Sequence, residues 1–252
     1  MASLHLLLID AGNTRVKWAT ASGHGKIVAR GNIPARDMTA ALLQKLARKY
    51  PTHRAVLASV VPKLTMLFRR AFAGRLYIVT GASPKLPLPF TYPRPVELGA
   101  DRIAAGAAAH AEGKWPAIIV SCGTAVAVTV IDAQGRLCGG AIAPGLYAQL
   151  AALVGATAQL PAVSLRPPKR LPAQSTEEAI RAGVLLNFRG GVKEIVTRLA
   201  ESLPGKARPH ILLTGGDVDA LKGVFGSRAV VRPLLVAEGL RIIGARVFAS
   251  PP

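Results

Sequence analysis

The sequence contains little cysteine, histidine and aromatic residue, and these shortages exclude several kinds of site. Two cysteines in 252 residues, Cys122 and Cys138, are too few for a disulfide framework or a four-cysteine metal centre. The five histidines lie far apart without the spacing of a zinc-binding helix, so a zinc site has no support. Aromatic residues make up only 5% of the chain, which predicts a core of aliphatic and alanine side chains.

Targeting and membrane segments are not recognisable either. Residues 4–9 are apolar but too short for a signal peptide, and they lead directly into a polar turn. The uncharged stretch of residues 116–131 is shorter than a membrane span and is broken by serine, glycine and threonine. We therefore expect a cytoplasmic protein without a membrane partner.

Acidic residues are scarce, and the chain is strongly basic. There are 32 Lys and Arg against 13 Asp and Glu, a formal net charge of +19. Such a charge suits an anionic partner, whether nucleic acid, a membrane surface or a phosphorylated substrate. It equally describes a basic surface with no dedicated patch, although basic residues gather in residues 36–54, 63–75 and 166–170. The plain basic surface is the favoured interpretation, and nucleic acid binding is the alternative.

In the first third of the chain, short apolar segments alternate with polar or glycine-containing turns. Such apolar runs predict strands, and a spacing of three to four residues predicts helices. Strands are expected at residues 4–9, 15–20, 27–32, 55–61 and 75–80, and helices at residues 39–50, just after Pro62, and at residues 100–112. The proline-rich residues 83–95 can be neither helix nor central strand.

The same succession begins again near residue 117. Placing Gly12 over Gly123 aligns a strand, a polar residue, a glycine and a threonine, followed in both places by two further strands. This weak internal repeat predicts an α/β fold of two similar halves, residues 1–114 and 115–252, with mixed sheets and a ligand between the halves. The second half continues with expected strands at residues 117–120, 125–131 and 210–214, helices at residues 177–202 and 237–248, and a helix after Gly216.

The turn after the first apolar strand is the first candidate for chemistry. It consists of Asp10-Ala11-Gly12-Asn13-Thr14. Glycine lets backbone N–H groups approach an anion closely, and a carboxylate at a strand end can hold Mg²⁺. The same residues are typical of a plain hairpin turn, so both interpretations stay open. Ser121-Cys122-Gly123-Thr124 has the matching place in the second half, and two such hairpins would face one phosphate chain.

A third glycine turn, Gly215-Gly216, follows the strand expected at residues 210–214. Either its backbone lies against adenine and ribose, or it is a strand-to-helix turn with Asp217 as the cap. The chain contains neither a Walker A sequence nor G-x-G-x-x-G, so P-loop and Rossmann sites have no motif support.

Four short motifs, in this order and spacing, resemble those of the type III pantothenate kinase family. They are Asp10-Ala-Gly-Asn-Thr14, Gly99-Ala-Asp-Arg102, Gly139-Gly-Ala-Ile-Ala-Pro-Gly145 and Thr214-Gly-Gly216. That family belongs to the acetate and sugar kinase, Hsp70 and actin superfamily, so the resemblance implies two ribonuclease-H-like (actin-like ATPase) halves with the nucleotide in the cleft between them. It also implies ATP-dependent phosphorylation of pantothenate to 4′-phosphopantothenate, the first step of coenzyme A biosynthesis. The implied cofactors are Mg²⁺ and a monovalent cation, K⁺ or NH₄⁺, and the implied assembly is a homodimer.

The resemblance also assigns roles to the residues that match the motifs. The implied ATP and phosphate ligands are Asp10, Gly12, Asn13, Thr14, Lys17, Gly123, Thr124, Gly215 and Gly216, with Asp10 also holding Mg²⁺. The implied pantothenate ligands are Tyr92, Gly99, Ala100, Asp101, Arg102 and Thr176. Asp101 would be the general base, and Arg102 would pair with the carboxylate of pantothenate.

Several of these assignments have a purely structural alternative. Arg102 is otherwise a surface arginine beside an aspartate, and Tyr92 otherwise packs against the proline-rich loop. Thr176 stands at a helix start, where a hydroxyl caps backbone N–H groups. Asp101 otherwise only stabilises its helix through the dipole, and Gly139-Gly140 otherwise form a tight turn.

One position departs from the family pattern. The family's second phosphate motif usually opens with an aspartate that helps to place the monovalent cation, and this chain has Ser121. A neutral hydroxyl predicts a cation site that is weaker, rebuilt or absent. Two other functions are alternatives: another kinase of the superfamily, which would have no reason for Tyr92 and residues 99–102, and a nucleic-acid-associated transcriptional accessory factor, which the positive charge would suit.

Overall fold

The first apolar run of the sequence becomes the central strand of a mixed five-stranded sheet. The computed structural model describes residues 4–22, 25–205 and 208–248. In spatial order the strands of this sheet are β3 (Ile27–Pro34), β2 (Arg15–Ser22), β1 (His5–Ala11), β4 (Arg54–Ser59) and β5 (Leu76–Ile78). β1 pairs antiparallel with β2 and parallel with β4, so the sheet joins a hairpin to parallel strands.

The second sheet repeats this order. Its strands are β8 (Leu137–Pro144), β7 (Ala125–Ile131), β6 (Ala117–Cys122), β9 (His210–Gly215) and β10 (Ala229–Val231). In each sheet, the third, second, first, fourth and fifth strands lie side by side in that order, and the first and fourth are parallel. The predicted α/β fold with two mixed sheets is confirmed, and the common strand order explains the internal repeat.

The chain divides into two units. Unit 1 contains the residues up to Trp115, Ile131–Gly139 and the residues from Leu234 onward, and unit 2 contains Pro116–Val130 and Gly140–Pro233. The last helix of the chain therefore belongs to unit 1. The boundary near residue 114 between two tandem halves stays a prediction.

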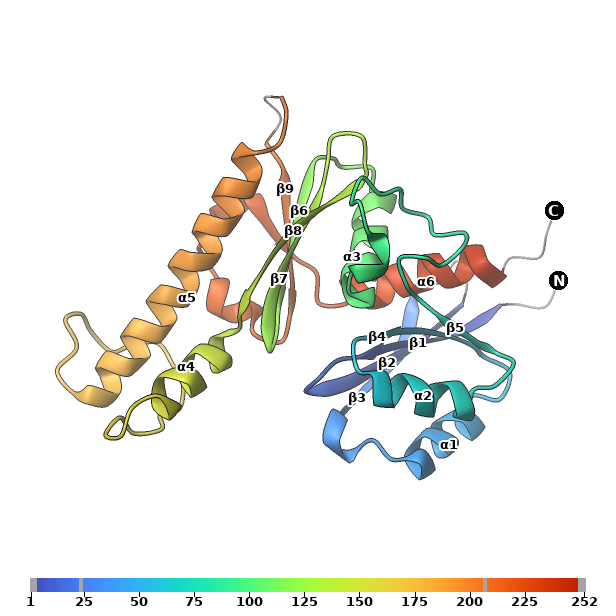
Figure 1. The fold of residues 1–252 in the computed structure, drawn as a ribbon, viewed down its shortest axis with the longest axis horizontal. Helices are drawn as coiled ribbons and strands as arrows, with labels where there is room; N and C mark the ends of the chain where they lie inside the picture. Colours follow the sequence, from blue (N-terminus) through green and yellow to red (C-terminus); the bar gives the residue numbers. More distant parts are fainter. Residues whose placement is uncertain (1–3, 23–24, 206–207, 249–252) are drawn as a thin grey trace. The chain divides into compact units, whose positions relative to one another are not determined.

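Helices cover both faces of the sheet in unit 1 (Figure 1). They are α1 (Ala40–Lys49), α2 (Pro62–Ala71), α3 (Ala100–Ala111) and α6 (Leu235–Phe248). α1 and α2 share a core with Leu7 and Ile9 of β1, whereas Gly244 of α6 packs on Leu6, whose side chain points to the opposite face. Because β1 is covered on both sides, its apolar residues form a continuous run rather than an alternating one.

Unit 2 contains two elements that the sequence did not lead us to expect. α4 (Leu146–Gly155) packs against the long helix α5 (Thr176–Glu201), and β10 completes the second sheet. The helix expected after Gly216 is instead a single 3₁₀ turn, Val218–Leu221, so that expectation is wrong. In the part of the chain that the structure describes, no helix is both long and apolar enough to cross a membrane.

α3 and α6 approach each other closely at Gly239. A Cβ atom there would lie 1.7 Å from the carbonyl oxygen of Ala104. We expect Gly239→Ala to lower the free energy of unfolding by about 1–3 kcal/mol, because the two backbones must move apart. Gly190→Ala is the matched control: a Cβ there meets nothing within 4 Å, and alanine is the better helix former by about 1 kcal/mol. Denaturant unfolding measures both changes, and equal stability of the Gly239→Ala variant and the wild type would contradict the expectation.

Candidate active site

The Asp10 carboxylate stands where the buried strand β1 ends. The four residues before it are at most 1% exposed, and Asp10 itself is partly buried. Its cross-strand partner in the hairpin is the exposed Lys17 of β2. Gly12, Asn13 and Thr14 form the turn between the strands, and both Asn13 and Thr14 are exposed. The predicted phosphate turn therefore presents its polar side chains to solvent beside a carboxylate.

The conformation of this turn does not explain its glycine. Short hairpin loops select glycine because their central residues need positive φ. Neither Gly12 nor its counterpart Gly123 has φ in that region, and the nearest atom to an added Cβ would be 3.4 Å away at Gly12 and 3.9 Å away at Gly123. A side chain would fit at both positions without strain. Neither positive φ nor crowding therefore accounts for these two glycines, which agrees with a backbone that a ligand approaches closely.

Burial changes the acidity of Asp10. Loss of solvent around the carboxyl raises the pKa of Asp10 from 3.8 to about 6. The lysine across the strand pair, Lys17, opposes this rise, and the negative charge of Asp101 adds to it. The two predicted acidic residues therefore belong to one electrostatic site of unit 1.

The first turn of α3 carries the next predicted residues. Gly99 is its N-cap, without a side-chain capping bond, and Asp101 and Arg102 follow, both partly buried. A Cβ at Gly99 would lie 2.6 Å from the Asp101 oxygen Oδ1. Ala100 is buried. The glycine therefore leaves space for the carboxylate beside it, while the alanine anchors the helix start.

Arg102 is held by the backbone of β8. Its Nη2 donates a hydrogen bond of 3.1 Å to the carbonyl of Gly139. Burial lowers the pKa of Arg102, and the neighbouring Asp101 and Tyr92 oppose that shift. Arg102 is thus not a freely solvated surface arginine. The expectation that Gly139-Gly140 form a tight turn is wrong, because both lie within strand β8 with φ of 138° and 143°.

The second hairpin lies in unit 2. The partly buried Ser121 is next to last in β6, and Gly123 and Thr124 form the turn to β7. The amide of Gly145 donates to the carbonyl of Thr124 at 3.1 Å. A Cβ at Gly145 would lie 2.0 Å from the carbonyl oxygen of Gly123. The start of α4 therefore packs directly on this turn, which is why a glycine precedes that helix.

Gly215, the last residue of β9, and Gly216, which follows it, are glycines for different reasons. A Cβ at Gly215 would lie 2.0 Å from the carbonyl oxygen of Cys122, so the pairing of β9 with β6 requires glycine there. A Cβ at Gly216 meets nothing within 4 Å. Asp217 makes no side-chain capping bond to the 3₁₀ turn that follows, so its predicted role as a helix cap is wrong. Of the pair, only Gly216 has no structural explanation.

Thr176 is the first residue of α5, and its side chain is exposed. The cap of this helix is the residue before it: Ser175 Oγ accepts a hydrogen bond of 3.3 Å from the amide of Glu178. The capping alternative for Thr176 is therefore wrong.

Sequence reasoning missed an ion-pair network beside Thr176. The Glu178 carboxylate accepts hydrogen bonds from Arg181 at 2.7 Å, from Arg166 at 2.8 Å and from the amide of Lys169 at 3.1 Å. The Arg181 side chain is only 7% exposed. These bonds tie the loop before α5 to the first turn of the helix. The sequence did contain one indication of this network: on the predicted helix, Glu178 stands three residues before Arg181, a spacing at which opposite charges pair.

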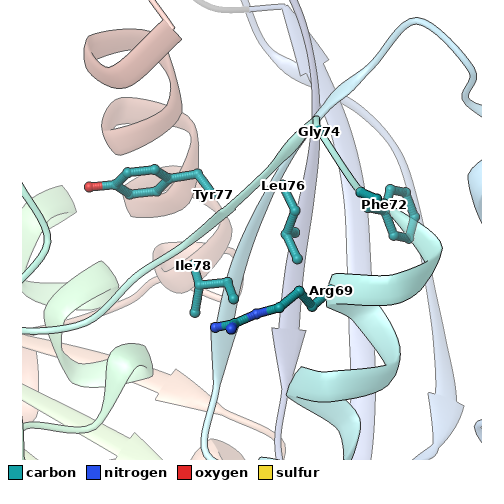
Figure 2. A pocket seen from close by; sticks show the side chains of 7 residues that line it. Arg69, Phe72, Gly74, Leu76, Tyr77 and Ile78 are labelled. Atoms are coloured by element: carbon teal, nitrogen blue, oxygen red, sulfur yellow. The ribbon is translucent and has the colours of Figure 1, made fainter.

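A pocket of unit 1 does not coincide with the predicted residues. Figure 2 shows its lining side chains, which come from the end of α2, the following turn and β5: Arg69, Phe72, Ala73, Gly74, Leu76, Tyr77 and Ile78. The strand register aligns Leu76 with Ala55 and Leu7, three residues before Asp10 and two strands away from it. This pocket is therefore separate from the Asp10 site.

The carboxylates of unit 1 suit one kind of metal. Among the described residues, no three His, Cys, Asp or Glu side chains gather as a metal site. Mg²⁺ needs fewer protein ligands, because it keeps several waters and shares oxygen atoms with phosphates. Asp10, with Asp101 in its electrostatic surroundings, meets that need. For a monovalent cation, Ser121 offers a single neutral oxygen.

The raised pKa of Asp10 predicts a pH-dependent stability difference. The folded state binds the Asp10 proton more tightly than the unfolded state, with a pKa of about 6 against 3.8. Ionisation therefore destabilises the fold as pH rises from about 4 to 6. Asparagine cannot ionise, so the Asp10→Asn variant should not lose this stability. Without nucleotide or Mg²⁺, we expect the free energy of unfolding of the variant minus that of the wild type to be about 1–3 kcal/mol larger at pH 7.5 than at pH 4. Asp37→Asn, at an exposed carboxylate, is the control. Thermal melts of both proteins across this pH range measure their difference in stability. A difference that does not change with pH would contradict the raised pKa of Asp10.

Solved structures share this fold at low sequence identity. A Baf family transcriptional activator from Campylobacter jejuni superposes with a TM-score of 0.63 at 19% identity, over 94% of this chain and 96% of that chain. The activator of 2-hydroxyisocaproyl-CoA dehydratase from Clostridium difficile, with bound ADPNP, has a TM-score of 0.55 at 14% identity, over 98% of this chain and 94% of that chain. At these identities the likeness concerns the fold alone.

Sequence comparison goes further. The type III pantothenate kinase family matches residues 6–198. A type III pantothenate kinase from Methylacidiphilum infernorum (isolate V4) is 34% identical over 239 residues, which cover 95% of this chain and 88% of the relative. The match includes β1 with its Asp10 turn, the start of α3 and the second hairpin. The chain therefore belongs to the type III pantothenate kinase family.

Proposed function

We propose that the chain transfers the γ-phosphoryl group of ATP to the hydroxyl of pantothenate, which forms 4′-phosphopantothenate and begins coenzyme A biosynthesis. The observation that carries the proposal is the site of unit 1, where the charge of Asp101 helps to raise the pKa of Asp10 and Arg102 stands next to Asp101 in the first turn of α3. A phosphoryl transfer needs a carboxylate for Mg²⁺, a second one to orient the attacking hydroxyl and a group that fixes the acceptor. Family membership supports this assignment.

For ATP, the proposal assigns the phosphates to the turn after β1 and to its counterpart after β6. When bound, Mg²⁺ neutralises negative charge on the transferring phosphates. The two glycines that the turns do not require support this assignment. The proposed ligands are Asp10, Gly12, Asn13, Thr14, Lys17, Gly123 and Thr124 for the phosphates and Mg²⁺, and Gly215 and Gly216 for the adenosine.

For pantothenate, we propose that Arg102 binds the carboxylate of the substrate. A guanidinium and a carboxylate form a charge-assisted pair that neutral groups do not match. Tyr92 and the exposed hydroxyl of Thr176 would bond other substrate oxygens, and Gly99 and Ala100 would let the backbone approach. The capping role of Ser175 supports the assignment of Thr176, because its hydroxyl is not needed by the helix.

Asp101 is proposed as the general base. It stands in the first turn of α3, where the positive end of the helix dipole stabilises a carboxylate. A weak base suffices in this reaction, because a loose transition state demands proton removal only late. Asp101 would mainly orient the hydroxyl and then accept its proton.

The finer parts of the proposal concern ions, assembly and location. We include a K⁺ or NH₄⁺ requirement, with Ser121 as a weak ligand, a homodimeric assembly and a cytoplasmic location. The resemblance to the family implies the cation and the homodimer, and the neutral Ser121 hydroxyl is the point at which this chain departs from the family pattern.

A coupled assay of ATP consumption tests the proposed function. Pantothenate is compared with a panel of sugars and short acids under identical Mg²⁺ and potassium conditions. We expect turnover with pantothenate alone. Turnover with a sugar or another acid instead would favour a different kinase of the superfamily, and no turnover together with strongly salt-dependent DNA binding would favour the nucleic-acid alternative.

Asp101→Asn separates a base from a structural carboxylate. As the base, Asp101 should contribute about 10²–10⁴-fold to kcat, with KM for ATP and the melting temperature nearly unchanged. As a helix-stabilising residue, it should cost only about 0.3–1 kcal/mol of stability and leave kcat within a few-fold. Glu97→Gln, at an exposed carboxylate paired with Arg94, is the control. Steady-state kinetics and a thermal melt on both variants decide between the two roles.

Ser121→Asp tests the cation assignment. A carboxylate added to an oxygen-lined site should attract a cation, so we expect the half-saturating potassium concentration to fall relative to wild type. Potassium titrations of both proteins in sodium-free buffer measure this change. Identical midpoints would mean that position 121 does not contact the ion, and a raised KM for ATP would mean that the new charge repels the phosphates instead.

A further inference from the structure

The start of β8 lies beside the segment that leads to Tyr92. The amide of Leu137 donates to the carbonyl of Pro89 at 2.9 Å, and the amide of Thr91 donates to the carbonyl of Leu137 at 3.0 Å. These bonds attach the end of the proline-rich loop to β8 in a parallel register. The next residues along the two segments therefore become neighbours, Tyr92 on the loop and Gly139 on the strand.

Gly139 contacts two of the side chains proposed to bind pantothenate. Its carbonyl oxygen accepts the 3.1 Å hydrogen bond from Arg102 Nη2. A Cβ at Gly139 would lie 3.6 Å from Cδ2 of Tyr92, so the tyrosine ring lies close against the glycine backbone. One backbone position thus connects a loop, a strand and a helix start.

The backbone torsions at this position require glycine. φ is 138° at Gly139 and 143° at Gly140, a region that L side chains rarely adopt. The peptide group between the two glycines carries the oxygen that Arg102 bonds. A side chain at Gly139 would favour negative φ and would turn this oxygen away from the helix.

The chemistry of Arg102 explains why such an acceptor matters. The guanidinium is partly removed from water, and this burial lowers its pKa. A buried donor needs an acceptor, and a fixed acceptor also fixes the plane of the guanidinium. A carbonyl carries no full negative charge, so this hydrogen bond does not by itself neutralise the guanidinium.

We propose that Gly139 is a positioning residue for substrate recognition: its carbonyl orients the Arg102 guanidinium, and the Tyr92 ring packs beside its backbone. This inference rests on the proposed function, in which Arg102 pairs with the carboxylate of pantothenate. A guanidinium held in one plane selects a carboxylate over an alcohol, because only the carboxylate accepts two parallel hydrogen bonds. Gly139 therefore determines specificity for the acid without touching it.

The first test is Gly139→Ala, assayed with pantothenate and with its alcohol analogue, in which a hydroxymethyl group replaces the carboxylate. We expect KM for pantothenate to rise about tenfold or more. KM for ATP and the inhibition constant of the alcohol analogue should change less than about twofold, because neither depends on the oriented guanidinium. A merely structural defect would weaken acid and alcohol equally, and that result would overturn the inference.

Gly113→Ala is the matched control. Gly113 also belongs to unit 1 and has a positive φ of 68°, and a Cβ there meets nothing within 4 Å. This variant shares the backbone strain without a contact to Tyr92 or Arg102. We expect its KM for pantothenate to stay at the wild-type value. A rise equal to that of Gly139→Ala would attribute the effect to strain alone and overturn the inference.

If Gly139→Ala folds poorly, Arg102→Lys tests separately whether substrate binding needs an oriented, planar guanidinium. The substitution retains the positive charge and the native backbone, but an ammonium cannot present a planar fork held in one orientation. We expect KM for pantothenate to rise about tenfold or more, close to the effect of Arg102→Ala. A wild-type KM would show that charge alone suffices, and the inference would fall.

The double variant separates the inference from the proposed function. If Gly139 acts through Arg102, then Gly139→Ala adds less than about twofold to KM in an Arg102→Ala background. Full additivity would overturn the inference and leave the proposed function intact. An unchanged KM in Arg102→Ala alone would instead overturn the assignment of Arg102 in the proposed function.

Discussion

Burial of β1 on both faces is the constraint on which the site depends. Helices α1 and α2 cover one face and α6 covers the other, so the strand has no solvated side along which a polar residue could stand. After the exposed His5 at its start, the strand has four buried apolar residues, and Asp10 is the polar side chain that follows them. The same exclusion of water that stabilises the strand raises the pKa of this carboxyl to about 6. Ionised Asp10 is therefore a group that gains from a bound cation, which is the property that a magnesium ligand needs.

α3 links the core of unit 1 to the other half of the site. Its middle residues are alanine and glycine, and nearly all of them are buried. Because these side chains are small, α6 can pack its Gly239 directly against the backbone of α3. A helix packed in this way has little freedom to rotate. Its first turn carries Asp101 and Arg102. Because the helix is held firmly by the core, the backbone of these two residues is also held in place, as the proposed reaction requires. The bond from Arg102 to Gly139 adds a second point of attachment outside the helix.

The sequence was sufficient for features that depend on local pattern. The strand β1, the repeat of Gly12 at Gly123 and the long helix α5 followed from continuous apolar runs, turn residues and a capping sequence. Elements that depend on long-range contacts were not predictable. β10 has three residues and exists through its pairing with β9, and α4 begins after Gly145, an N-cap residue that has no side chain to cap the helix. The hydrogen bond between Arg102 and Gly139 was not predictable for the same reason, because the two residues are 37 positions apart.

The surroundings of each glycine distinguish those that the fold requires from those that it does not. Gly239 and Gly215 have backbone atoms within 2.0 Å of where a Cβ would stand, so packing alone accounts for them. Gly12 and Gly123 have neither a close neighbour nor positive φ. Packing and backbone conformation therefore do not account for the glycine at either turn. The polar residue beside each turn has diverged, however: β1 keeps a carboxylate at its end, whereas β6 has only the hydroxyl of Ser121. The two turns therefore share a glycine that packing does not require, but only the turn of unit 1 has a carboxylate beside it.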